Sequence, residues 1–133
     1  MRVVDASVVL GWLLGQEASA GAAAALREHV DGREPLVAPE LLHYEIANVL
    51  VRGASLSAEL ARQGYAHFEA LEIETYSLGA AEYDAAISIA AEHRVTAYDA
   101  AYAALALALR CRFLTSDRKL ARALAPLGVA DLL

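Results

Sequence analysis

Short apolar runs alternate with longer amphipathic segments along the whole chain. Runs bounded by polar residues, glycine or proline predict β-strands at residues 2–5, 35–39, 73–78, 112–116 and, as a short strand or tail, 129–133. Segments with an apolar period near 3.6 predict helices at residues 6–15, 17–30, 40–53, 57–72, 79–94, 98–110 and 117–128. Strands separated by helices favour parallel pairing, because each return crossing needs a helix.

The segment 40–53 is the clearest amphipathic helix. Leu42, Ile46 and Leu50 fall on one face, and Gly53 ends the segment. Ser57 is the expected N-cap of the helix that follows. Since no break is long enough for a domain boundary, we expect one domain over residues 1–133. Its predicted architecture is a three-layer α/β/α sandwich with a central, mainly parallel sheet.

Composition fits a compact, water-soluble chain. Hydrophobic residues make up 58% of its 133 residues, which argues against disorder. No apolar run reaches the roughly 18–20 residues that span a bilayer, so we predict no membrane association. The single cysteine, Cys111, permits no internal disulfide and is interpreted as a small buried hydrophobe. We therefore expect a cytoplasmic protein.

Four acidic residues stand near strand ends or helix starts. Asp5 ends the first strand, Asp117 follows the strand FLTS, and Asp99 begins the helix after VTAY. Glu45 lies one turn into the helix after the second strand. Taken singly, Asp5 and Asp117 could be plain N-caps, and Asp99 could stabilise a helix start through the helix dipole. Because chemistry in parallel sheets gathers at the carboxyl ends of the strands, the four together also predict a site there.

Convergence of these carboxylates requires a cation. Two unit charges 4 Å apart repel by about 4 kcal/mol at an effective dielectric constant of 20. Oxygen-only ligands favour Mg²⁺ or Mn²⁺ over Zn²⁺. The histidines support no zinc site, since none pairs with another at helical spacing and none adjoins the cysteine; they are His29, His43, His67 and His93.

Four motifs carry a resemblance to a known family. VVDAS, YEIANVL, TAYDAAYAALA and FLTSD resemble the motifs of PIN-domain ribonucleases, most of all the VapC-type toxins of VapBC toxin–antitoxin modules. The resemblance runs from about Val3 to Leu120, and YDAAYAALA is its most specific part. It implies a PIN-like fold and a toxin of a type II toxin–antitoxin system. The implied activity is a metal-dependent endoribonuclease that cleaves RNA phosphodiesters with a metal-activated water.

The resemblance also implies a role for each matching residue. The four acids would be both catalytic and metal-binding, with Mg²⁺ or Mn²⁺ as the cofactor: Asp5, Glu45, Asp99 and Asp117. Ser7 and Thr115 would support the acids by hydrogen bonds, and Asn48 would orient a ligand or touch the RNA. The chain carries a net charge of −6, but five bases cluster between residues 110 and 122. From this cluster we predict that Arg112 and Arg118 hold the RNA backbone.

The implied partners are an RNA substrate, a cognate VapB-type antitoxin and a second copy of the chain. Trp12 is predicted to be mostly core, with a groove for the antitoxin as the alternative. Tyr65, Phe68 and the alanine-rich helix faces are predicted to form a homodimer surface, although sequence does not separate this from core packing.

Two other functions compete with the nuclease. One is a catalytically inactive PIN-like binding module, which the presence of all four acids disfavours. The other is a phospho-receiver domain, which is also α/β with an acidic Mg²⁺ pocket. That domain would need paired acids after the first strand and a lysine after a late strand, whereas this chain has Asp5 alone and Lys119 inside a helix.

Overall fold

A central parallel sheet organises the protein, for which the computed structural model describes residues 1–15 and 19–133. Within them the strands are β1 (Arg2–Val4), β2 (Leu36–Pro39), β3 (Glu74–Tyr76), β4 (Arg112–Thr115) and β5 (Ala130–Leu132). Every neighbouring pair is parallel, and the strand order is β3-β2-β1-β4-β5. This order differs from the 2-1-3-4-5 order of flavodoxin-like receiver domains, so the phospho-receiver alternative is wrong.

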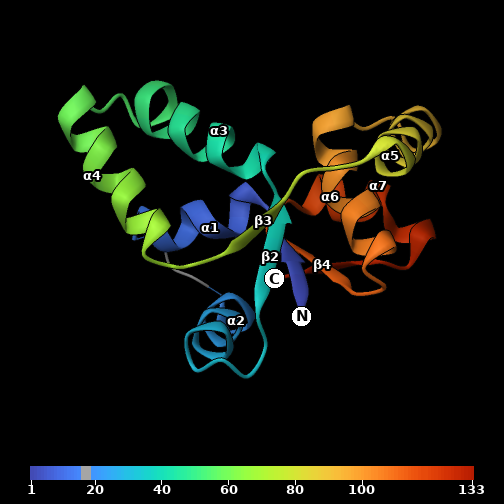
Figure 1. Cartoon of the computed structure of the whole chain (residues 1–133), viewed down its shortest axis with the longest axis horizontal. Coiled ribbons are helices and arrows are strands. Elements are labelled where there is room, and N and C mark those ends of the chain that lie inside the picture. Colours follow the sequence, from blue (N-terminus) through green and yellow to red (C-terminus); the bar gives the residue numbers. More distant parts are fainter. Residues whose placement is uncertain (16–18) are drawn as a thin grey trace.

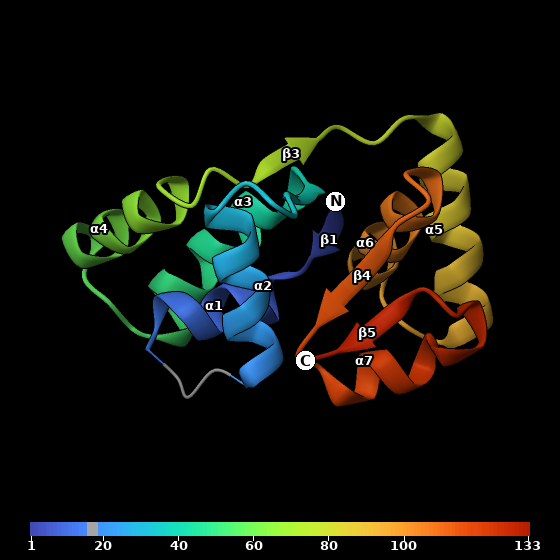
Figure 2. The same cartoon turned by 90° about the horizontal axis from the view of Figure 1, so that it is seen from below.

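Helices cover both faces of this sheet, as the sequence predicted. Along the described chain they are α1 (Ala6–Leu13), α2 (Ala20–Val30), α3 (Leu41–Asn48), α4 (Ala58–Glu69), α5 (Ala80–His93), α6 (Ala97–Ala108) and α7 (Arg118–Ala123). Figure 1 shows the strands between two groups of helices. Figure 2 shows α1 to α4 on one side of the molecule and α5 to α7 on the other. None of the described helices combines the length and apolarity needed to cross a membrane.

Several helix ends differ from the predictions. The predicted helix 40–53 changes after α3 into a π-helical turn, Val49–Gly53, in which the amide of Ala54 donates to the carbonyl of Val49. The predicted helix 117–128 is divided, because Pro126 lacks an amide hydrogen and a short 3₁₀ turn follows α7. The predicted helix 17–30 is described from Ala20, with Ser19 as its N-cap, and residues 17 and 18 lie outside the described residues.

The core lies where α6 crosses the three central strands. Val3 pairs in register with Val37 and Phe113, and all three are buried. Residues 100–106 of α6 are also buried, and five of these seven residues are alanine. Small side chains let a helix approach the sheet closely. This packing fixes the start of α6 at the edge where β1, β2 and β4 end.

Candidate acidic site

Asp5 is a buried carboxylate directly after the central strand. It is only 5% exposed and is the N-cap of α1. Its Oδ1 atom accepts hydrogen bonds from Ser7 Oγ at 2.5 Å and from the amide of Val8 at 3.2 Å. Burial raises the pKa of the Asp5 carboxyl, and hydrogen bonds from Ser7 and Thr115 oppose that rise. The N-cap interpretation is therefore correct, but it leaves a charge in a site that disfavours charge.

Hydrogen bonds join the ends of β1 and β4. Ser7 Oγ lies 3.4 Å from Thr115 Oγ1 and accepts a hydrogen bond from the amide of Ser116 at 2.9 Å. Thr115 is fully buried, and its Oγ1 accepts from the amide of Asp117 at 3.0 Å. Asp117 in turn caps α7 through Oδ1, which accepts from the amides of Lys119 and Leu120. Asp5 and Asp117 are thus held by one connected set of polar groups.

Glu45 reaches the same edge from α3. It is half-buried, and its Oε2 accepts a hydrogen bond from the hydroxyl of Tyr102 on α6. Burial raises the pKa of the Glu45 carboxyl, the charges of Asp5 and Asp99 raise it further, and the Tyr102 hydrogen bond opposes the rise. Glu45 and Asp99 also line one hollow, which places these two carboxylates at the same edge of the sheet.

Tyr102 is a member of the site that the sequence interpretation missed. It is 1% exposed, and its ring stacks on Phe113 with centroids 5.8 Å apart. Burial, followed by the neighbouring Glu45 carboxylate, raises the pKa of its hydroxyl well above the usual range. The hydroxyl therefore stays protonated and donates. Spacing could have indicated this role, because Tyr102 follows Asp99 by three residues and so shares its face of α6.

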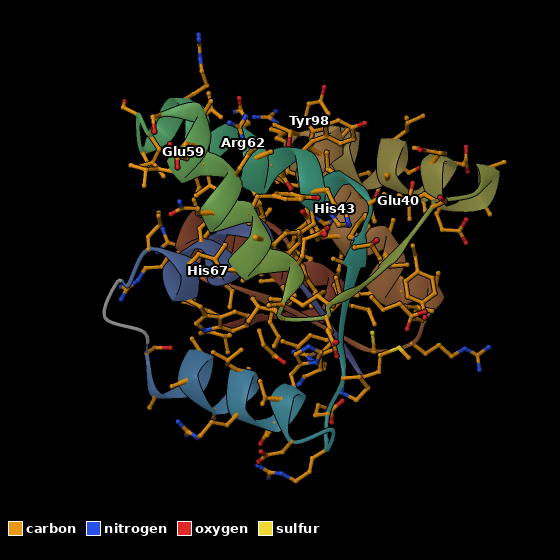
Figure 3. All side chains as sticks on the ribbon, turned by 60° about the vertical axis from the view of Figure 1, so that its left-hand side comes forward. Glu40, His43, Glu59, Arg62, His67 and Tyr98 are labelled. Carbon is orange, nitrogen blue, oxygen red and sulfur yellow. The ribbon has the colours of Figure 1, made fainter. Side chains whose placement is uncertain are left out.

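Asp99 connects two hollows at this edge. Its amide donates to Thr96 Oγ1 at 3.0 Å, so Thr96 is the N-cap of α6 and Asp99 lies in the first turn. One hollow, of about 380 Å³, is also lined by Glu45 and Asn48. The other, of about 220 Å³, is also lined by Asp117. Tyr98, seen beside α3 in Figure 3, lines the first hollow.

The two predicted RNA-binding arginines differ in position, since Arg112 begins β4 and Arg118 directly follows Asp117. Arg112 begins β4, at the opposite end of that strand from Thr115, and its guanidinium binds both carboxylate oxygens of Asp131. Arg118 is exposed, but it lines neither hollow that contains Asp99. The structure therefore does not bring Arg112 to the acids, because strand polarity puts it at the far edge of the sheet.

Two side chains outside the acidic site also have clear surroundings. His43, labelled in Figure 3, lies between α3 and α4, with Nδ1 2.7 Å from the hydroxyl of Tyr65 and Nε2 3.2 Å from Thr75 Oγ1. Phe68 is 2% exposed and belongs to the core, so of the two alternatives that the sequence left open for it, core packing is the correct one. In the described part of the chain, the structure contains no group of three or more acidic, histidine or cysteine side chains already placed to bind a metal ion.

The fold and the site together define a class of protein. It is an α/β domain with acidic side chains near the carboxyl ends of its parallel strands. The chain belongs to the PIN domain family, whose model matches residues 2–124. It is 32% identical over 126 residues to Ribonuclease VapC3 of Pyrobaculum aerophilum, covering 90% of this chain and 91% of that relative. The crystal structure of PAE2754 from the same organism superimposes with a TM-score of 0.67 at 25% identity, covering 92% of this chain and 83% of that one. The resemblance found in the four motifs is confirmed.

Proposed function

We propose that this chain is a Mg²⁺- or Mn²⁺-dependent endoribonuclease and the toxin of a type II toxin–antitoxin pair. The observation that carries the proposal is that ionised carboxylates are energetically unfavourable in the acidic site of this chain. Asp5 and Glu45 have raised pKa values because they are buried, and Glu45 also because of neighbouring acids. Carboxylates with perturbed pKa values gather at functional sites, and a bound cation would offset the cost of their ionisation. The similarity to a named ribonuclease supports RNA as the substrate.

The residues present fit a hard divalent cation. The candidate ligands are carboxylates only, which suits Mg²⁺ or Mn²⁺ better than Zn²⁺. Asp5 and Asp117 each accept helix amides through Oδ1. In our proposal Asp5, Glu45, Asp99 and Asp117 hold the cation. When bound, it would activate a water and stabilise the charge that develops on the phosphate.

The chain's own residues have separate tasks in this proposal. Tyr102 donates to Glu45 and keeps that carboxylate aligned while its second oxygen is available. Ser7 and Thr115 hold Asp5 and Asp117 in fixed orientations through their hydroxyls. Asn48 shares the hollow of Glu45 and Asp99, where its amide can donate to an RNA phosphate or hydroxyl.

Cleavage of mixed cellular RNA by the purified protein tests the function. The reaction is run with Mg²⁺, with Mn²⁺ and with a chelator, using the parent chain, Asp99→Asn and Asp84→Asn. Asp84 is a matched control because it has the same YDAA context but lies exposed on α5. We expect discrete fragments that need the metal and Asp99 but not Asp84. Absence of cleavage by folded protein free of any copurified partner would favour the inactive binding module.

We further propose a VapB-type antitoxin and a homodimer as partners. Trp12 is partly buried against the core, and the antitoxin groove remains our alternative for its outer edge. Exposed apolar side chains also gather on α5 and α6, where Tyr83, Ile87 and Tyr98 line one groove and are 59%, 65% and 65% exposed. We place the dimer contact there. Sedimentation should give a dimer for the parent and a monomer for Ile87→Glu; a monomeric parent would refute the homodimer.

A further inference from the structure

The smaller hollow beside Asp99 has a mixed charge. It measures about 220 Å³ and lies between the start of α6 and the helix α7. Asp99 and Asp117 line it, and so do two cations, Arg94 and Lys119. Arg94 ends α5, and Lys119 is the only lysine in the chain. The proposed nuclease mechanism assigns no role to either cation.

These cations do not neutralise the acids beside them. Across the described residues, no carboxylate lies within 4.0 Å of Arg94 or Lys119, although both side chains share a hollow with two aspartates. Both residues are exposed, so their charges face solvent. Arg112, by contrast, is fully engaged by Asp131. The hollow therefore combines acids available for a cation with cations available for an anion.

RNA supplies such an anion at every nucleotide. The chain has a net charge of −6, so its acidic site repels phosphates unless local cations offset the repulsion. Arg and Lys bind phosphate oxygens by charge-assisted hydrogen bonds. A phosphate in this hollow would lie next to Asp99 and Asp117, at the border of the proposed cleavage site.

Building on the nuclease function proposed above, we propose that Arg94 and Lys119 bind an RNA backbone phosphate adjacent to the one that is cut. They act as positioning residues, because they hold the strand while the acids serve the reacting phosphate. The contact is to the backbone and carries no sequence preference by itself. It takes the place of the contact predicted for Arg112, which lies at the other end of β4 and is engaged by Asp131.

Binding of a labelled single-stranded RNA 12-mer in chelator tests this proposal separately from cleavage. The variants are Arg94→Gly and Lys119→Gln, and Arg110→Gly is the matched control. Arg94 and Arg110 are both exposed and both have left-handed backbones, with φ of 55° and 53°. Arg110 follows α6 at the far edge of the sheet. Glycine removes the charge and suits this backbone at both positions, so unfolding cannot explain a loss of binding by Arg94→Gly.

We expect weaker binding for Arg94→Gly and Lys119→Gln but unchanged binding for Arg110→Gly. For single strands the slope of log K against log salt changes by about 0.7 for each phosphate contact. Each variant should therefore lower the slope by about that amount at most, since both side chains share one phosphate. Equal binding by the parent, Arg94→Gly and Lys119→Gln would overturn the proposal.

The single lysine permits a second, direct measurement. An amine-acylating reagent reacts with the parent chain only at Lys119 and at the Met1 amino group, and the latter is paired with Glu34. RNA should slow acylation of Lys119 and leave Met1 unaffected, as read by peptide mass spectrometry. Acylation of Lys119 that saturating RNA does not slow would overturn its role.

Failure of this inference and failure of the nuclease function give different results. Metal-dependent cleavage with no effect of Arg94→Gly or Lys119→Gln keeps the nuclease and refutes the phosphate contact. RNA binding that depends on both cations, without cleavage in either metal, upholds the contact and refutes the nuclease. A parent chain that neither binds nor cleaves RNA refutes both.

Discussion

Replacing Tyr102 with phenylalanine tests whether the Tyr102–Glu45 hydrogen bond supports the acidic site. The substitution removes one hydroxyl and keeps the ring stacked on Phe113. Hydrogen bonds to charged groups contribute about 1.5–3 kcal/mol to stability. Because water can reach the half-buried Glu45, we expect the lower end, about 1.5 kcal/mol at pH 7. For a chain of this length that lowers Tm by on the order of 5 °C.

The loss of stability should depend on pH. Burial raises the pKa of Glu45 in the folded chain, so its ionisation costs folded-state stability as pH rises above the ordinary carboxyl pKa. The Tyr102 hydrogen bond opposes that rise, so its benefit is complete when Glu45 is ionised. The difference between parent and variant should therefore be largest at neutral pH. It should shrink as pH falls through the range in which Glu45 takes up its proton.

Urea unfolding in chelator, at neutral and mildly acidic pH, measures this difference without bound metal. Tyr83→Phe is the matched control, because the hydroxyl of Tyr83 has no hydrogen-bond partner in the described chain and the substitution keeps the ring that we place at the dimer contact. A loss of stability that is equal at both pH values, or equal to that of the control, would refute the reasoning. Metal affinity measured by calorimetry should fall for Tyr102→Phe and not for Tyr83→Phe.

Three further substitutions have defined outcomes. Asp5→Asn should raise the Tm of metal-free protein at neutral pH in thermal melts, because it removes a buried carboxylate with a raised pKa and keeps an N-cap acceptor. The same substitution should abolish RNA cleavage in the cleavage assay. Thr115→Val should lower stability by about 1 kcal/mol in urea unfolding, since the part-buried amide of Asp117 loses its acceptor. Arg112→Ala should leave RNA affinity unchanged in a binding titration, because Asp131 already engages that guanidinium.

The alternation of strands and helices was predictable because apolar periodicity follows directly from how each element packs. The positions of Asp5 and Asp117 after strands and at helix starts were predictable because they are local features of the sequence. The position of Arg112 was not predicted correctly. It is close to Asp117 in the sequence, but it lies at the start of β4, whereas Asp117 follows the end of that strand. Lys119 and Arg94 were not paired by the sequence because they meet only through packing of α5, α6 and α7.

Phe68 and Tyr102 show a second limit. Both are aromatic residues on helices, and periodicity did not separate an inward face from an interface. In the structure Phe68 is core, and Tyr102 is core with a hydroxyl directed at Glu45. A buried tyrosine needs a partner for its hydroxyl, so an acid on a facing helix is the signal to seek. That signal requires knowing which helices face each other, which the sequence alone did not supply.

The hydrogen-bonded link between Ser7 and Thr115 has a consequence for the protein during its synthesis. It joins residues 108 positions apart, and Asp117 follows two residues later. A chain still being made on the ribosome therefore holds Asp5 long before it holds the partner strand that completes the site. An enzyme that destroys RNA would be a hazard to the machinery translating it. Here the catalytic constellation we propose cannot assemble until translation has passed Asp117.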